Sequence, residues 1–125
     1  MNKDEPLFDA PLDAWAIRTR DARAKAAQAY ARLLSLAEER DSGQIRRIAQ
    51  FIASTYNGGA FPFDLFDLRA VDVAIGDDML ACLDALRWGK ADLYKLVPDG
   101  ERRVQARHHG VGAEVARGRL NEPRA

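Results

Sequence analysis

The stretch NGGAFPFDLFDLRAVDVAIGDDMLACLDAL, residues 57–86, decides the fold of this protein. It contains six aspartates, no glutamate and no lysine, and large apolar residues lie between the aspartates. An aspartate just before an apolar run is a common helix N-cap, because its carboxylate accepts the unpaired backbone N–H groups of the first turn. The pattern therefore predicts a short helix over residues 65–70 and a longer helix over residues 73–88.

The sequence leaves open whether this stretch forms two helices or one. In the two-helix interpretation, Asp64 and Asp67 cap the short helix and Asp72 caps the long one. In a single continuous helix, the apolar residues fall on one stripe: Leu68, Val71, Ile75, Met79, Cys82 or Leu83, and Leu86. Gly76 slightly disfavours the continuous helix. The chain either bends near Asp72 or runs straight through it.

The chain before this stretch predicts a long amphipathic helix over residues 13–40. It contains no glycine or proline and is rich in good helix formers. The predicted core face consists of residues at helical spacing, Ala26, Tyr30, Leu33, Leu34 and Ala37. The predicted solvated side carries the basic residues Arg18, Arg20, Arg23, Lys25 and Arg32.

A second helix is predicted after Asp41. Asp41 and Gln44 have the spacing of a capping box, in which each side chain satisfies a free backbone N–H. The apolar residues then repeat at helical spacing, namely Ile45, Ile48, Ala49 and Ile52. The run Asn57-Gly58-Gly59 is predicted to end this helix, because Asn and Gly accept the left-handed conformation that closes many helices.

The C-terminal third contains a strong turn signal, Pro98-Asp99-Gly100. Its flanks over residues 90–108 form either two strands of a hairpin or a helical turn followed by a basic helix, and the composition favours helix. We therefore predict an all-α protein, a small bundle of about four helices over residues 13–108. Residues 1–12 are predicted to form an extended arm and residues 109–125 a loose, flexible basic tail.

Bulk composition excludes several classes of protein. The 125 residues suffice for one domain, and the formal net charge is zero. The single cysteine excludes an internal disulfide and a cysteine-built zinc site. No apolar run approaches the length of a membrane span, and the N-terminus lacks the apolar core of a signal peptide. We therefore expect a cytoplasmic protein.

Two motifs, DSGQIRRIAQFI (residues 41–52) and FDLFDLRAVDVAIGDDMLACL (residues 63–83), resemble a family of small uncharacterised bacterial proteins. The resemblance covers about residues 30–103. Proteins of this kind are found on plasmids and integrative conjugative elements of proteobacteria, and carry a domain of unknown function. The resemblance implies a small helical domain in a mobile-element setting, and it assigns no catalytic residue.

The sequence shows no catalytic or metal-binding constellation. The aspartates lack the alternation and closing glutamate of a calcium loop, since Phe66 and Ala74 interrupt them. His108 and His109 would point about 100° apart on a helix and would not share one ion well. Cys82 has no histidine near it in sequence that could activate it as a nucleophile. We expect no cofactor and no enzymatic activity.

The preferred functional hypothesis is a non-enzymatic accessory protein of a mobile element that binds another protein. Its predicted contact residues are acidic and lie on the exposed side of the decisive stretch: Asp77, Asp78 and Asp84. The alternative is a helix-turn-helix-like regulator that binds nucleic acid through Gln44, Arg46, Arg47, Arg102, Arg103 and Arg107. The zero net charge argues against this alternative, because it gives little non-specific affinity for phosphates.

Overall fold

The computed structural model describes residues 12–40, 42–88 and 92–107. The described residues include the α-helices α1 (Leu12–Glu39), α2 (Gly43–Tyr56) and α3 (Val73–Trp88) and the 3-10 helices η2 (Leu65–Ala70) and η3 (Leu93–Leu96). Residues 100–107 are also helical, and no strand occurs in the described ranges. The prediction of an all-α bundle is confirmed. Apart from Leu12, the predicted arm lies outside the described residues, as does the predicted tail.

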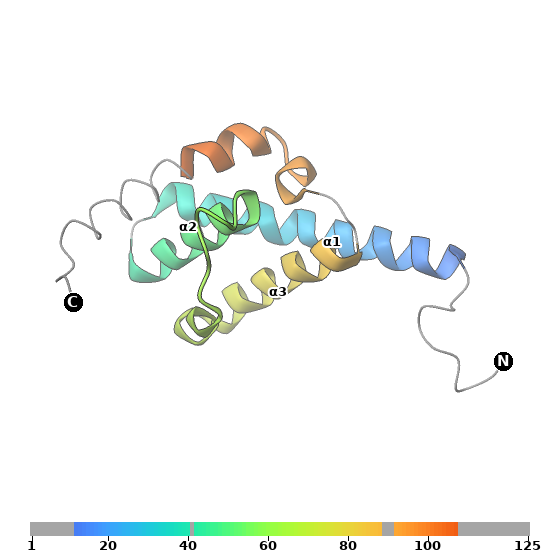
Figure 1. Cartoon of the computed structure of the whole chain (residues 1–125), viewed down its shortest axis with the longest axis horizontal. Coiled ribbons are helices and arrows are strands. Elements are labelled where there is room, and N and C mark those ends of the chain that lie inside the picture. The colour runs from blue at the N-terminus through green and yellow to red at the C-terminus, as the bar shows by residue number, and fades with distance from the viewer. Residues whose placement is uncertain (1–11, 41, 89–91, 108–125) are drawn as a thin grey trace.

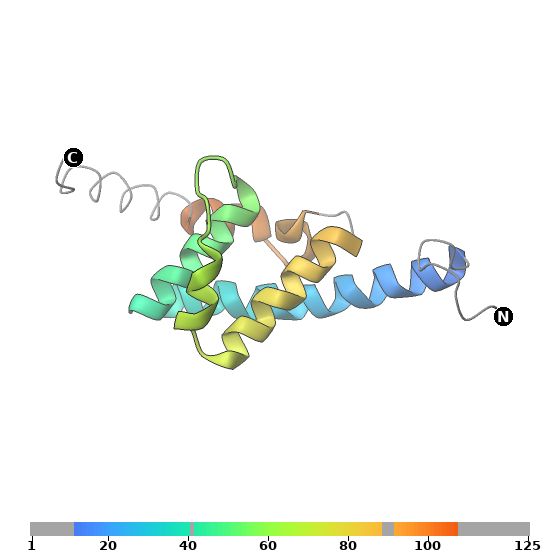
Figure 2. The same ribbon diagram turned by 60° about the horizontal axis from the view of Figure 1, so that its bottom comes forward.

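Helix α1 is the axis on which the other elements pack. It contacts α2, α3 and η3. Figure 1 shows α3 on one side of α1, with η3 and the helical segment 100–107 on another. Helix α3 runs antiparallel to α1, since Arg18 pairs with Asp84 while the later residue Arg32 pairs with the earlier Asp78. The first turns of α1 project beyond the rest of the bundle (Figure 2).

The core lies where α1 meets α2 and α3. Every residue of the predicted α1 face is buried: Ala26, Tyr30, Leu33, Leu34 and Ala37. Helix α2 buries Ile45, Ile48 and Ile52 as predicted, and also Phe51, which the periodicity omitted. Helix α3 contributes Ile75, Met79, Cys82 and Ala85. Small alanines on α1 let α3 approach closely, because helix separation depends on the side chains at the contact.

The decisive stretch forms two helices, η2 and α3, with the predicted bounds. The backbone is extended at Val71 between them. Gln44 of α2 holds the bend, since its Oε1 accepts the Asp72 N–H at 2.5 Å and its Nε2 donates to Asp72 Oδ2 at 3.3 Å. Asp64 caps η2 as predicted and accepts the Phe66 N–H. The continuous-helix alternative is therefore wrong.

Two local predictions around α2 are also wrong. Ser42 caps this helix and accepts the Ile45 N–H at 3.3 Å. Gln44 does not take part in a capping box, because its side chain accepts the N–H of Asp72 at the bend before α3. The helix ends at Tyr56 as predicted, but Asn57 has φ −147° and is not left-handed. Its side-chain oxygen instead accepts the Ala60 N–H at 3.2 Å, which closes the turn.

Of the predicted range 90–108, the structure describes residues 92–107, and these contain helical segments and not a hairpin. Leu93 of η3, Val97 and Val104 are buried against the core. Asp99 supplies the turn between η3 and the last helical segment, with φ 56°. Within the described ranges, none of the helices has the combination of length and hydropathy that a membrane crossing requires.

Candidate protein-binding site

Two ion pairs join α1 to α3. Arg32 donates to both oxygens of Asp78, at 3.0 Å from Nε and 2.7 Å from Nη2. These hydrogen bonds raise the pKa of Arg32 above its ordinary value. Arg18 Nη2 lies 2.6 Å from Asp84 Oδ2, and this hydrogen bond lowers the pKa of Asp84, with a further contribution from Arg87. Both arginines were predicted on the side of α1 opposite the core face, and their side chains do remain 40% (Arg18) and 58% (Arg32) exposed, but the ion pairs with α3 were not predicted.

The three aspartates of the predicted acidic contact surface are therefore not equivalent. The side chains of Asp78 and Asp84 are only 16% and 26% exposed, and each is engaged by arginine. Asp77 is exposed, and among the described residues no ion pair neutralises it. The structure thus leaves Asp77 as the carboxylate of this set that a partner could contact without breaking an internal bond.

The residues of the nucleic-acid alternative lie on two elements, α2 and the segment 100–107, and most of them make internal contacts. Arg47 pairs with Asp67 at 3.5 Å, and Gln44 holds Asp72. In the last segment, Arg102 pairs with Asp99, Arg103 pairs with Glu38, and Arg107 donates to the carbonyl oxygen of Ala37. Arg46 is exposed on α2 and also has an interaction partner.

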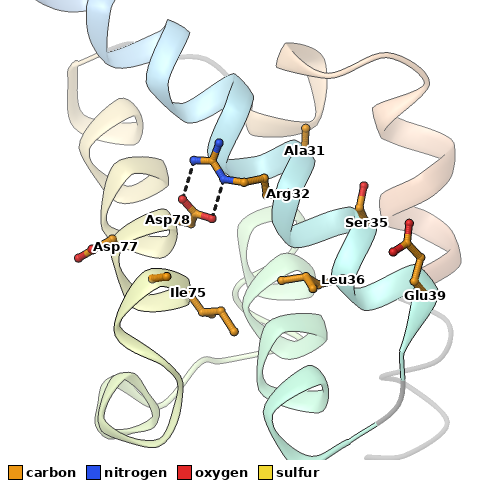
Figure 3. Close-up of a pocket in the computed structure, with 9 residues that line it drawn as sticks. Ala31, Arg32, Ser35, Leu36, Glu39, Ile75, Asp77 and Asp78 are labelled. Carbon is orange, nitrogen blue, oxygen red and sulfur yellow. Dashed lines mark hydrogen bonds and ion pairs between the residues drawn. The ribbon is translucent and has the colours of Figure 1, made fainter.

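An open groove of about 730 Å³ lies between the second half of α1 and the start of α3 (Figure 3). We call it the α1–α3 groove. Its walls include Ala31 and Leu36 of α1 and Ala74 and Ile75 of α3. Leu36 and Ile75 face each other across it, and the Arg32–Asp78 pair bridges the two helices at one end. The groove therefore presents apolar surface between two helices, closed at one end by a neutral ion pair.

Exposed apolar side chains also lie on η2 and on α3, the helix that forms one wall of the α1–α3 groove. Leu65 and Phe66 of η2 are 69% and 72% exposed, and Val73 and Leu80 of α3 are 80% and 55% exposed. The sequence interpretation did not identify these side chains as exposed. A signal was present in α3, where Val73 and Leu80 are seven residues apart and fall off the core stripe.

Charge on the rim of the α1–α3 groove is acidic. Arg32 and Asp78 neutralise each other, and the remaining charged rim residues are Glu39 and Asp77. Both carboxylates are exposed, and neither forms an ion pair within the described residues. They lie on opposite sides of the groove, one on each helix (Figure 3). The α1–α3 groove thus has apolar walls, and on either flank it carries a carboxylate that no described residue pairs with.

The other candidate chemistry of the sequence finds no site in the described residues. No three His, Cys, Asp or Glu side chains within those ranges are grouped to hold a metal ion. Cys82 is buried, and burial raises its pKa to about 12, with a smaller contribution from the charge of Asp78. A thiol of this kind is a poor nucleophile, because the reactive species is the thiolate. His108 and His109 lie outside the described residues.

Comparison with known proteins yields a family match over most of the chain. No curated protein and no solved structure matches it significantly. A family model matches residues 27–110, which include α2, α3 and both walls of the α1–α3 groove. That span agrees with the motifs that carried the resemblance in sequence. The chain belongs to a family of unknown function (DUF7673).

Proposed function

We propose that this protein is a non-enzymatic protein-binding module that uses the α1–α3 groove and the neighbouring apolar side chains of η2 and α3. The observation that carries the proposal is the open apolar groove between α1 and α3, together with exposed apolar side chains on η2 and α3, namely Leu65, Phe66, Val73 and Leu80. Contiguous exposed apolar surface on a soluble protein commonly marks an interaction site. The accessory role in a bacterial mobile element belongs to the same proposal and is supported by the sequence resemblance alone.

The energetics of burial favour a macromolecular partner at this site. Covering a fully exposed Val, Leu or Phe side chain contributes about 1.5–3 kcal/mol. Covering these four side chains of η2 and α3 would thus contribute several kcal/mol to the free energy of association. This contribution must offset the entropy that two molecules lose when they associate. A small molecule in an open groove would leave much of its own surface in water, whereas binding pockets usually bury most of their ligand.

Affinity capture with matched surface variants tests the proposal. The tagged full chain is used to capture proteins from the native host, alongside the double variant Val73→Gln/Leu80→Gln. The control is Leu12→Gln/Ile17→Gln, which changes two exposed apolar residues on the projecting end of α1. We expect the wild-type chain and the control to recover the same specific proteins, and the Val73/Leu80 variant to lose them.

Two results would contradict the proposal. One is that all three chains recover the same proteins, which would place the interaction on another surface. The other is that none recovers a protein above the tag alone, with or without the mobile element in the host. Circular dichroism of each variant shows that a loss of capture does not come from unfolding, since the substituted side chains are already exposed.

A further inference from the structure

Resting on the proposed function, we infer the kind of segment that the α1–α3 groove binds. The occupant is an amphipathic α-helix whose apolar stripe is flanked on both sides by lysine or arginine. The stripe contacts the groove walls, and the basic residues of the two flanks meet Asp77 on one side and Glu39 on the other. Three features of the site lead to this assignment: the shape of the groove, the charge of its rim and the end of helix α1.

The shape of the groove favours a helix over an extended peptide. An extended segment gains affinity by adding its backbone to an exposed sheet edge, and the described residues contain no strand. A helix satisfies its own backbone hydrogen bonds and needs only side-chain contacts. The groove lies between two antiparallel helices with Leu36 and Ile75 in its walls, so the side-chain ridge of a third helix can pack between them.

The charge on the rim of the groove determines which charge the flanks of the bound helix should carry. Arg32 is held by both oxygens of Asp78, so this pair offers no net charge to a partner. The carboxylates of Asp77 and Glu39 remain, one on each side of the groove. A helix with basic residues on both sides of its apolar stripe complements this arrangement. A helix with acidic flanks would be repelled on both sides.

The end of α1 strengthens the preference for a cation. Carbonyl groups at a helix C-terminus carry partial negative charge, which favours lysine or arginine nearby. The last turn of α1 contains no basic residue of its own, although Arg40 follows it directly and Arg107 donates to the carbonyl oxygen of Ala37. Glu38 is neutralised there by Arg103, whose Nη2 lies 2.7 Å from Glu38 Oε1, but Glu39 has no ion-pair partner among the described residues. A basic side chain of the bound helix would therefore pair with Glu39.

Selection from a library of displayed helical peptides tests the inference. The probes are 16-residue helices with a randomised central stripe and randomised flanks, selected on the immobilised full chain. Enriched peptides are expected to combine Leu, Ile or Met in the stripe with Lys or Arg on both flanks. Their affinity should fall about three- to tenfold in Asp77→Lys and in Glu39→Lys, as expected for reversal of one exposed charge contact. Glu101→Lys, an exposed carboxylate on another element, should bind like wild type.

A steric variant locates the bound peptide. Ala31 lines the groove, so Ala31→Gln fills part of it with a neutral helix former, whereas Ala24→Gln makes the same change at an exposed position of α1 outside it. Binding should be lost in the first variant and kept in the second. The inference is overturned if the enriched peptides have acidic or uncharged flanks, if no helix is enriched, or if Ala31→Gln binds as well as Ala24→Gln.

Sedimentation of the wild-type chain and of Ala31→Gln tests a second copy as the occupant. A dimer that Ala31→Gln dissociates would place that copy in the groove and overturn the inference. The failure of the inference can be told apart from the failure of the proposed function. Host proteins lost only from the Val73/Leu80 variant would still support a protein-binding module, even if no basic helix were selected.

Discussion

Single arginine–carboxylate pairs fasten the outer elements to α1. Arg103 donates to both oxygens of Glu38, at 3.0 Å from Nε and 2.7 Å from Nη2, and so connects the last helical segment to the end of α1. This hydrogen bonding lowers the pKa of Glu38 below its ordinary value of 4.5. The Arg18–Asp84 pair acts in the same way at the other end of α1 and lowers the pKa of Asp84.

The Glu38 pair predicts a loss of stability in acid. A carboxylate whose pKa is lower in the folded state stabilises the fold above its unfolded pKa, and this contribution disappears as pH falls through the folded pKa. Glu38→Gln should lower the free energy of unfolding by about 0.5–1 kcal/mol at pH 7. The difference in the free energy of unfolding between wild type and Glu38→Gln should narrow as pH falls below about 4.5. Urea unfolding at pH 7, 5, 4 and 3, followed by circular dichroism, measures it.

The control for this prediction is Glu101→Gln, which removes an exposed carboxylate that has no ion-pair partner within the described residues. Its stability should follow wild type at every pH. If the curves of Glu38→Gln and wild type ran parallel down to pH 3, the pair with Arg103 would make no pH-dependent contribution, and the prediction would fail.

At the scale of single residues, the sequence predicted the apolar contacts better than the polar ones. Periodicity identified the buried face of α1, because burial follows the 3.6-residue repeat. The same repeat placed Arg18 and Arg32 on the solvated side, although both extend to carboxylates of α3. Arginine is long enough to reach a partner from the edge of a helix face. Its partner therefore depends on how two helices cross. The apolar repeat of a single helix carries no information about that crossing.

At the scale of elements, helix bounds were predicted wherever a local signal marks them. The bounds of η2 and α3 coincide with the predicted ones, because the Asp64 cap of η2 and the apolar runs of both helices are local features. The break between them was left open, because it depends on Gln44 of α2, which binds both the N–H and the carboxylate of Asp72. A residue 28 positions away in sequence thus decides where one helix ends and the next begins.

Replacing glycine with alanine is expected to have opposite effects on stability at Gly100 and at Gly76. A Cβ at Gly100 would lie 2.7 Å from Val97 Cγ2 and would collide with the carbonyl oxygen of Tyr94, so the last helical segment would have to shift. A Cβ at Gly76 in α3 would meet no atom within 4 Å. Gly100→Ala should lower the free energy of unfolding by about 1–3 kcal/mol. Gly76→Ala should raise it by about 0.5–1 kcal/mol.

Thermal unfolding of both glycine variants beside wild type measures these effects, and the Gly76 variant controls for the change of residue type. An unchanged melting temperature for Gly100→Ala would show that the turn between η3 and the last segment adapts at no cost. A loss of stability in Gly76→Ala would contradict the open space around that position.

At the scale of the whole molecule, the sequence predicted the class of fold but not its surface. An all-α bundle follows from the patterns of the separate helices. The α1–α3 groove depends on how α1 and α3 cross, and on the Arg32–Asp78 pair that spans them. The exposure of Leu65, Phe66 and Val73 depends on which side of η2 and α3 turns inward. These relations between elements decide the candidate site, so most of it was missed.

The single cysteine reports on the opening of the whole bundle. Cys82 is fully buried in α3 on the side that packs into the core with Tyr30 and Met79, and burial raises its pKa to about 12. Because a thiol reagent needs both access and the thiolate, labelling requires α3 to separate from α1. At pH 8 without denaturant, labelling should be at least about 10³-fold slower than in urea, in line with the stability of a small domain.

An exposed cysteine gives the reference rate for the labelling experiment, and the Gly100→Ala variant tests whether labelling follows stability. Cys82→Ala combined with Ala24→Cys places the only thiol on the exposed side of α1, and it should react at the rate of a free thiol. Gly100→Ala should speed the labelling of Cys82, since labelling follows the population of the open state when opening and closing are fast. Rapid labelling of native wild-type chain would show that α3 leaves α1 locally. The walls of the α1–α3 groove would then move apart without global unfolding, and the bundle would not be a single cooperative unit.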